Sequence, residues 1–427
     1  MSIFEIIILS LPLVVVLLSI AFMPLITPKF WRKYETIWLL IISVVSIIST
    51  YKIIPSANQI IKHSLLDDYL PFIIMVFTVY VLSSGIRIQM TSSACSIANI
   101  VFLVCGGFLA SFIGTTGASV LLLPPFLEMN KNRVHKTHLI VFFIFLVANI
   151  GGMLTPLGDP PIFFGYLHGV DFSWPLINLF PYWLGYTVSC LCILYVIDKV
   201  MLKKEESLAF LEKQKFSIKI NGWLDIILLA LTVFVLFVDF ECEINICGLS
   251  VSSVFIRNLT LLIFAGTSIC SRGKNSINLT PCAEVAKIFL AIFIVITPVL
   301  FILNENTETI RAYVESVSRG SSSVPLYFWF GAITSSFLDN TPSYLLFFNI
   351  AGGNAQSLMH AYPNILTAIS VSTVVMGAMT YIGNAPNLMI RSIAEGKGIK
   401  MPSFIGYMAL SCLIILPISF VAALLMR

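Results

Sequence analysis

A chain of 427 residues that is 58% hydrophobic and only 11% charged cannot be an ordinary water-soluble protein, because such proteins carry about a quarter charged residues. Its mean hydropathy is +0.96. Its formal net charge of +4 gives no indication of a nucleic-acid partner. The composition predicts a protein embedded in the lipid bilayer.

Apolar segments long enough to cross a bilayer, about 17–25 residues, follow one another from end to end. Residues 1–27 lack the basic start of a cleavable signal peptide, so we interpret them as the beginning of a first span. The simple spans are predicted at 3–27, 36–54, 70–87, 174–198, 222–240, 248–271, 284–303 and 403–426.

Two apolar stretches, 95–129 and 324–351, are too long for one crossing and are interrupted by small polar residues. The interruptions fall at 114–119 (GTTGAS) and 338–343 (LDNTPS). Irregular polar backbone at membrane depth is tolerated only where it packs within protein or lines a water-filled cavity. We therefore predict two re-entrant hairpins, each entering and leaving on the same side.

Two further spans, 136–170 and 365–394, are predicted to be broken helices. The sequence TPLGDPP at 155–161 recurs as TYIGNAP at 380–386, an offset of 225 residues (380 minus 155). The serines of the hairpin tips, Ser119 and Ser343, repeat at an offset of 224 (343 minus 119). Interrupted spans at corresponding positions of two halves are the best sequence indication of a transporter's binding site.

These elements predict an all-α polytopic membrane protein with two inverted repeats, 1–200 and 222–427, joined by a cytoplasmic linker at 201–221. Each repeat has about five transmembrane helices, including a hairpin and a broken helix. An odd number of crossings per repeat inverts the second repeat and places both termini outside. Most Lys and Arg residues then fall in cytoplasmic loops, as the positive-inside rule requires.

Broken helices expose backbone carbonyl and amide groups that can bind ions, and the interruptions also supply neutral side-chain oxygens. An alternative is that the small residues only let helices pack closely. The predicted cation- or substrate-binding residues are Thr115, Thr116, Ser119, Asn149, Thr155, Gly158, Asp159, Asp339, Asn340, Thr341, Ser343, Thr380, Gly383 and Asn384.

The two carboxylates of this set, Asp159 and Asp339, are the strongest indication of chemistry. An ionised Asp at the bilayer centre costs about 2.5–3.5 kcal/mol, and neither motif contains a Lys or Arg to pair with it. A transported cation that alternates with a proton would neutralise them, which predicts proton exchange at Asp159 and Asp339. Capping of a helix, or bonding to nearby backbone, is the alternative for each.

The sequences VANIGG–LTPLGD at 147–159, FLDNTP at 337–342 and TYIGNAPN at 380–387 resemble bacterial sodium/proton antiporters of the ion-transporter superfamily, whose relatives include citrate and dicarboxylate carriers and arsenite pumps. The resemblance implies a homodimer in the inner membrane, with a scaffold near 3–87 and 222–303 and a mobile unit that moves by an elevator-like mechanism. Carboxylate carriers of this superfamily have Ser-Asn-Thr at both hairpin tips, whereas this chain has Gly114-Thr115-Thr116 and Asp339-Asn340-Thr341.

We therefore expect a secondary transporter that exchanges Na⁺ or Li⁺ for protons, with the bilayer and a small inorganic cation as its partners. No cofactor and no resident metal are predicted. The alternative is Na⁺-coupled transport of citrate or a dicarboxylate, and a channel is a third possibility. An enzyme is not expected, because no HExxH or GxSxG motif occurs.

Overall fold

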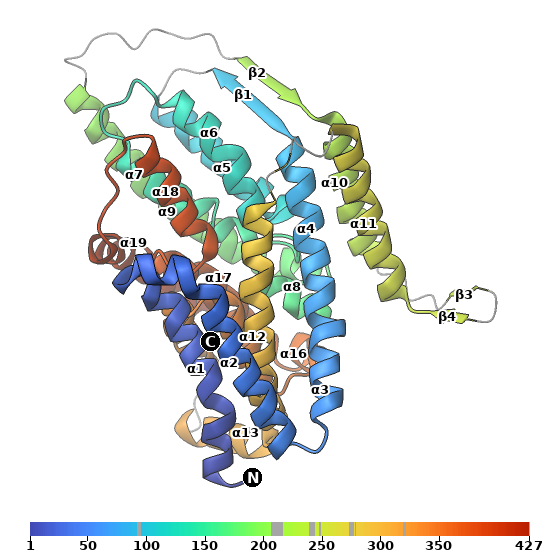
Figure 1. The fold of residues 1–427 in the computed structure, drawn as a ribbon. Helices are drawn as coiled ribbons and strands as arrows, with labels where there is room; N and C mark the ends of the chain where they lie inside the picture. Colours follow the sequence, from blue (N-terminus) through green and yellow to red (C-terminus); the bar gives the residue numbers. More distant parts are fainter. Residues whose placement is uncertain are drawn as a thin grey trace.

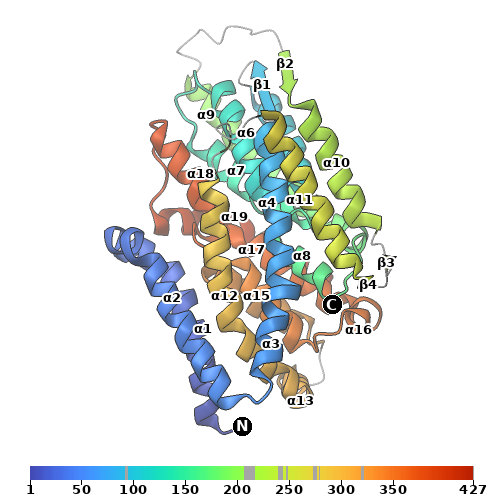
Figure 2. The same ribbon diagram turned by 45° about the vertical axis from the view of Figure 1, so that its right-hand side comes forward.

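The computed structural model describes residues 1–91, 95–205, 217–238, 244–246, 249–272, 277, 279–318 and 322–426. Within these residues, eight helices are long and apolar enough to cross a membrane. The chain is thus an all-α polytopic membrane protein, as its sequence predicts (Figures 1 and 2).

The first half contains four long spans, a hairpin and a broken helix. Its elements are α1 (Ile3–Ile26), α2 (Pro28–Ile53), α3 (Ala57–His63), the π-helix η1 (Ser64–Tyr69), α4 (Leu70–Gly85), β1 (Arg87–Thr91), α5 (Ser96–Ile113), α6 (Thr115–Met129), α7 (Thr137–Leu146), the 3₁₀ turn η2 (Ile150–Met153), α8 (Pro160–Leu167) and α9 (Trp174–Glu205).

The second half repeats this order: three apolar helices precede its hairpin, its broken helix and its last span. Its elements are β2 (Ser217–Asn221), α10 (Trp223–Val238), β3 (Ile244–Ile246), β4 (Leu249–Val251), α11 (Ser253–Arg272), α12 (Thr280–Glu305), α13 (Thr307–Ser318), α14 (Val324–Phe337), α15 (Asn340–Ile350), α16 (Ala355–His360), α17 (Pro363–Met376), the 3₁₀ turn η4 (Gly377–Met379), α18 (Ala385–Gly396) and α19 (Phe404–Leu425).

The two hairpins enter the molecule from opposite ends. Hairpin α5–α6 follows β1, which lies at one end of the molecule, whereas hairpin α14–α15 follows α13, which lies at the other end beside the N-terminus (Figures 1 and 2). Their tips therefore approach each other from opposite directions.

Several boundaries differ from those expected. Helix α2 begins at Pro28 rather than at 36, and the third span is α3, η1 and α4 in continuous succession over Ala57–Gly85. The charged pair Asp67 and Asp68 lowers the local hydropathy and hides the first part of that span. The amphipathic helix α13 was not predicted.

The linker predicted at 201–221 is shorter than expected. Helix α9 continues to Glu205, and residues 217–221 form β2, which pairs antiparallel with β1 from Arg87↔Asn221 to Thr91↔Ser217. The linker's central part, 206–216, lies outside the described residues. The β1–β2 pair ties the beginning of the second half to the end of α4.

A buried ionic cluster fixes the loop between α6 and α7. Arg133 is 2% exposed and contacts Asp198 at 2.7 Å and Glu205 at 2.9 Å. His138 lies 2.8 Å from the same Asp198 oxygen. Because both acids belong to α9, the cluster attaches the open end of the first hairpin to that long helix.

Candidate functional site

The first hairpin turns at Gly114, which separates α5 from α6 with φ of 75° and ψ of 145°. A positive φ favours glycine because it has no Cβ atom. The next residue, Thr115, donates its backbone N–H to the Gly158 carbonyl at 2.8 Å. The tip is therefore attached directly to the interruption of the first broken helix.

That interruption is held by one hydroxyl and two glycines. Thr155 donates its Oγ1–H to the Ser111 carbonyl and accepts the Leu157 N–H at 3.2 Å. A Cβ atom on Gly158 would lie 2.3 Å from the Gly152 carbonyl oxygen, so no larger residue fits there. Asp159 follows in extended conformation and begins α8 as its N-cap residue.

The second half builds the same arrangement 225 residues later. Thr380 donates to the Ser336 carbonyl, Gly383 packs on Gly377, and Asn384 begins α18 in the extended conformation that Asp159 has before α8. Asp339 stands where the first half has Gly114, with φ of 56° and ψ of 143°. At the turn itself the offset is 225 (339 minus 114), one more than the tip serines indicate.

Three polar side chains, one from the first half and two from the second, converge at Asp159. Thr115 donates to Asp159 Oδ1 at 3.0 Å, Asn384 donates to the same oxygen at 3.5 Å, and Asn340 donates to Oδ2. Asp159 is 1% exposed. Among the described residues, no Lys or Arg forms an ion pair with this carboxylate, which is surrounded by neutral donors.

A chain of asparagines extends this group between the two interruptions. Asn384 also donates to Asn149 Oδ1 at 3.2 Å, and Asn149 donates to Asn387 Oδ1 at 2.9 Å. Asn387 then donates to the carbonyls of Gly377 at 2.8 Å and Thr380 at 3.0 Å. Asn387 was not among the predicted site residues, although it directly follows the repeated motif.

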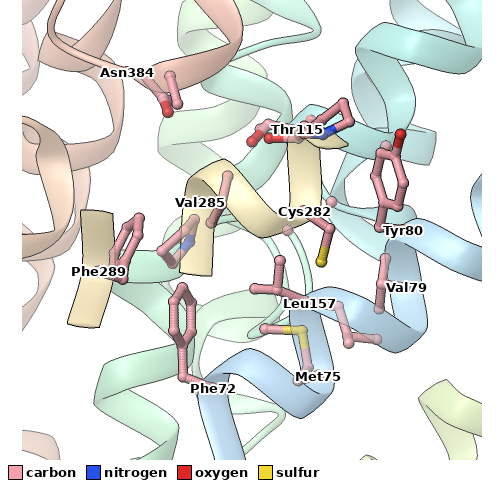
Figure 3. Close-up of a pocket in the computed structure, with 18 of the residues that line it drawn as sticks. Phe72, Met75, Val79, Tyr80, Thr115, Leu157, Cys282, Val285, Phe289 and Asn384 are labelled. Carbon is pink, nitrogen blue, oxygen red and sulfur yellow. The ribbon is translucent and has the colours of Figure 1, made fainter. Parts of the chain in front are cut away.

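A cavity of about 80 Å³ lies against the hairpin tips. Figure 3 shows Thr115 and Asn384 across it from the apolar side chains of Phe72, Met75 and Phe289, which belong to α4 and α12. Thr116, Gly158, Asp339 and Asn340 also line the cavity, whereas Asp159 lies behind its wall, between the lining residues Gly158 and Pro160. Among the described residues that line it, there is no Lys, Arg or His. The cavity thus has one polar wall, from the hairpins and interruptions, and one apolar wall.

The remaining predicted residues make local contacts. Ser119 donates to the Thr115 carbonyl at 2.7 Å and Ser343 to the Asp339 carbonyl at 3.0 Å, while Thr341 donates to Asn340 Oδ1 at 3.3 Å. These hydroxyls, like those of Thr155 and Thr380, stabilise the polar wall in this conformation.

Asp339 differs from Asp159 in having a structural role as well. Its Oδ1 accepts the Thr341 N–H at 3.2 Å, so it caps α15, one of the alternatives that the sequence left open. It is half-buried, and among the residues described it has no Lys or Arg partner.

The backbone at Asp339 predicts how substitutions there affect stability. A residue other than Gly in such a conformation costs about 1–3 kcal/mol. We expect Asp339→Gly to unfold at or above the wild-type temperature in detergent, because released strain offsets the lost cap. Asp339→Ala keeps the strain and loses the cap, so it should unfold at a lower temperature. Gly114→Ala is the matched control and should also be destabilised; equal stability of the Ala and Gly variants at 339 would contradict this explanation.

Comparison with protein families gives one result that covers nearly the whole chain. A family model described as "Putative citrate transport" matches residues 4–427. A search of curated proteins finds none that matches. The family match therefore includes both hairpins, both interrupted helices and Asp159.

Proposed function

The chain belongs to the family described as "Putative citrate transport", and within that family we propose that it is a secondary transporter exchanging Na⁺ or Li⁺ for protons. Asp159 is the residue at which the two ions compete. The other ligands would come from Thr115, Asn340 and Asn384, with Asp339 as a second exchanging carboxylate at the edge of the cavity.

The observation that carries this proposal is the surroundings of Asp159. A carboxylate at membrane depth is costly without a compensating charge, and here its hydrogen-bond donors are all neutral. A bound cation or a proton would each supply that charge. Since both cannot occupy the same oxygens, binding of one favours release of the other, which is the requirement for exchange.

The composition of the cavity favours a cation over a carboxylate substrate. A carboxylate needs donors and, commonly, basic side chains. Within the part of the chain that the structure describes, no Lys, Arg or His lines the cavity, whereas Asp339 does. About 10–15 Å³ holds one water molecule, so a cavity of about 80 Å³ suits a small ion with a few waters. These properties support Na⁺ as the substrate.

Na⁺-coupled transport of citrate or a dicarboxylate is the second candidate, because the family's description names citrate. Helices α6 and α15 begin at the cavity, at Thr115 and Asn340, and N-termini of helices favour anions. In that mechanism bound Na⁺ would have to neutralise Asp339 before the anion enters.

For the movement itself we propose an elevator-like mechanism. The hairpins and interrupted helices would form the mobile unit and would slide against a scaffold of α1–α4 and α10–α12. The apolar wall that α4 and α12 present to the cavity supports this division, because a polar wall would bind the ion to the immobile part. A homodimer in a bacterial inner membrane, with both termini outside, completes the proposal.

Everted membrane vesicles test the substrate. With a pH gradient generated by respiration, we expect Na⁺ or Li⁺ to collapse the gradient in vesicles that contain the protein, and K⁺ or choline to have no effect. Citrate should neither cause nor increase the collapse. Na⁺-dependent uptake of labelled citrate, without proton movement on addition of Na⁺ alone, would instead establish the second candidate.

A further inference from the structure

A second cavity lies between the scaffold and the hairpin unit, at the end of the molecule that carries α3, α13 and α16 (Figures 1 and 2). Its volume is about 670 Å³, far more than the volume of about 80 Å³ of the cavity against the hairpin tips. Its wall contains many polar side chains, so it is suited to hold water. The polar lining residues include His63, Asp68, His168, Asn304, Asn349 and Asn354.

The two cavities are stacked along the same two scaffold segments. On η1 and α4, Asp68 lines the large cavity and Phe72 lines the cavity against the hairpin tips. On α12, Thr297 lines the large cavity and Phe289 lines the other. Four residues of helix advance about 6 Å, so only about one or two turns separate the two spaces.

Three phenylalanines form a cluster at the boundary of the cavities. Phe72 lines the smaller cavity, and Phe164 and Phe293 lie on α8 and α12 between residues that line the one cavity and residues that line the other. Phe72 and Phe164 have ring centroids 4.9 Å apart, Phe164 and Phe293 are 5.0 Å apart, and Phe72 and Phe293 are 6.3 Å apart. Each is at most 2% exposed. Aromatic rings at these separations pack favourably, and a dry apolar layer is a barrier to a hydrated ion.

The three rings come from both parts of the proposed transporter. Phe72 and Phe293 belong to α4 and α12 of the scaffold, whereas Phe164 belongs to α8, the second half of the first broken helix. Asp159 begins this same short helix. A displacement of α8 would therefore move Phe164 together with the ion-binding carboxylate.

We propose that the large cavity is the external vestibule of the transport path and that Phe72, Phe164 and Phe293 form the gate that separates it from Asp159. Movement of α8 withdraws Phe164 from the other two rings and admits the hydrated cation. This inference rests on the proposed transport function. In the conformation described, the gate is closed.

Cys282 provides a test because its thiol lies at the cavity against the hairpin tips (Figure 3). The test uses a chain that retains Cys282 as its single cysteine, in vesicles of known orientation. A charged, membrane-impermeant methanethiosulfonate is added to one side of the membrane at a time, and the rate at which it labels Cys282 is measured. Ser2→Cys, in the otherwise cysteine-free chain, marks the face on which the N-terminus lies.

Phe164→Ala and Phe293→Ala should each accelerate labelling of Cys282 from the N-terminal face by about tenfold, which corresponds to about 1.4 kcal/mol. Labelling from the opposite face should keep its wild-type rate. Phe164→Leu serves as a second variant should the alanine substitution prevent folding. Phe126→Ala is the matched control, because Phe126 is also buried but packs on Phe102 and Phe143 and lines neither cavity.

Unchanged labelling rates in folded gate variants, or an increase from the opposite face only, would overturn the proposal. The labelling rate does not depend on which ion is carried. If the gate variants are labelled faster but the protein does not exchange Na⁺ for protons, the proposed substrate is rejected and the access path is kept. If the protein exchanges Na⁺ for protons but the gate variants are labelled at the wild-type rate, the access path is rejected and the substrate is kept.

Discussion

Asp159→Asn is expected to abolish Na⁺-induced proton movement while leaving the protein folded. The amide removes the negative charge that would attract Na⁺ and can no longer take up or release a proton. Removal of one partner from a buried charge pair costs about 3–5 kcal/mol, so exchange should fall by about a hundredfold or more, since 1.4 kcal/mol is a factor of ten. The assay is the collapse of a pH gradient in everted vesicles.

The variant should remain folded because its hydrogen bonds can be rebuilt. The asparagine oxygen can still accept from Thr115 and Asn384, and a turn of the Asn340 amide restores the third contact made by the wild-type carboxylate. Asp171→Asn is the control, since Asp171 is exposed and lines neither cavity; it should retain full activity. Normal exchange by a well-folded Asp159→Asn protein would reject Asp159 as the exchanging residue.

Gly158→Ala is expected to remove transport by distorting the interruption that positions Asp159. The new methyl group would lie 2.3 Å from the Gly152 carbonyl oxygen and 2.7 Å from its carbon, and both are backbone atoms that cannot turn away. Overpacking of this kind costs about 1–3 kcal/mol or more. We expect exchange to fall at least about tenfold and the unfolding temperature in detergent to fall as well.

The equivalent change in the second half, Gly383→Ala, should act in the same way, because its methyl group would lie 2.7 Å from the Gly377 carbonyl oxygen. Gly185→Ala and Gly266→Ala are matched controls in α9 and α11, where an added Cβ meets nothing within 4 Å. Alanine favours a helix over glycine by about 1 kcal/mol, so neither control should lose stability. Equal exchange activity and equal unfolding temperature in all four variants would contradict this prediction, because they would show that the backbone at the interruptions can shift without loss of transport.

The hairpins could be located from the sequence to within one residue, at 95–129 and 324–351 against helices that span 96–129 and 324–350. Long apolar stretches with a polar tip have few other solutions in a bilayer. The π-helix η1 was missed because Asp67 and Asp68 lower the hydropathy of a segment that is nevertheless continuous with α4.

The grouping at Asp159 could be predicted only in part. The repeat indicates which residues correspond, such as Asp159 and Asn384, but it does not indicate that Asn340 from the other half donates to Asp159. That contact depends on how far each hairpin reaches into the molecule. Pairing of β1 with β2 likewise joins segments more than a hundred residues apart (217 minus 91 is 126), and local sequence contains no signal for it.

The central claim is that Na⁺ and a proton compete for Asp159, and proton release on binding tests it most directly. Purified protein in weakly buffered detergent solution would be given NaCl, with choline chloride as the control, while the pH is recorded. We predict that NaCl releases protons in proportion to the protein present and that Asp159→Asn abolishes this release. Absence of proton release from wild-type protein, or an equal release from folded Asp159→Asn, would contradict the claim.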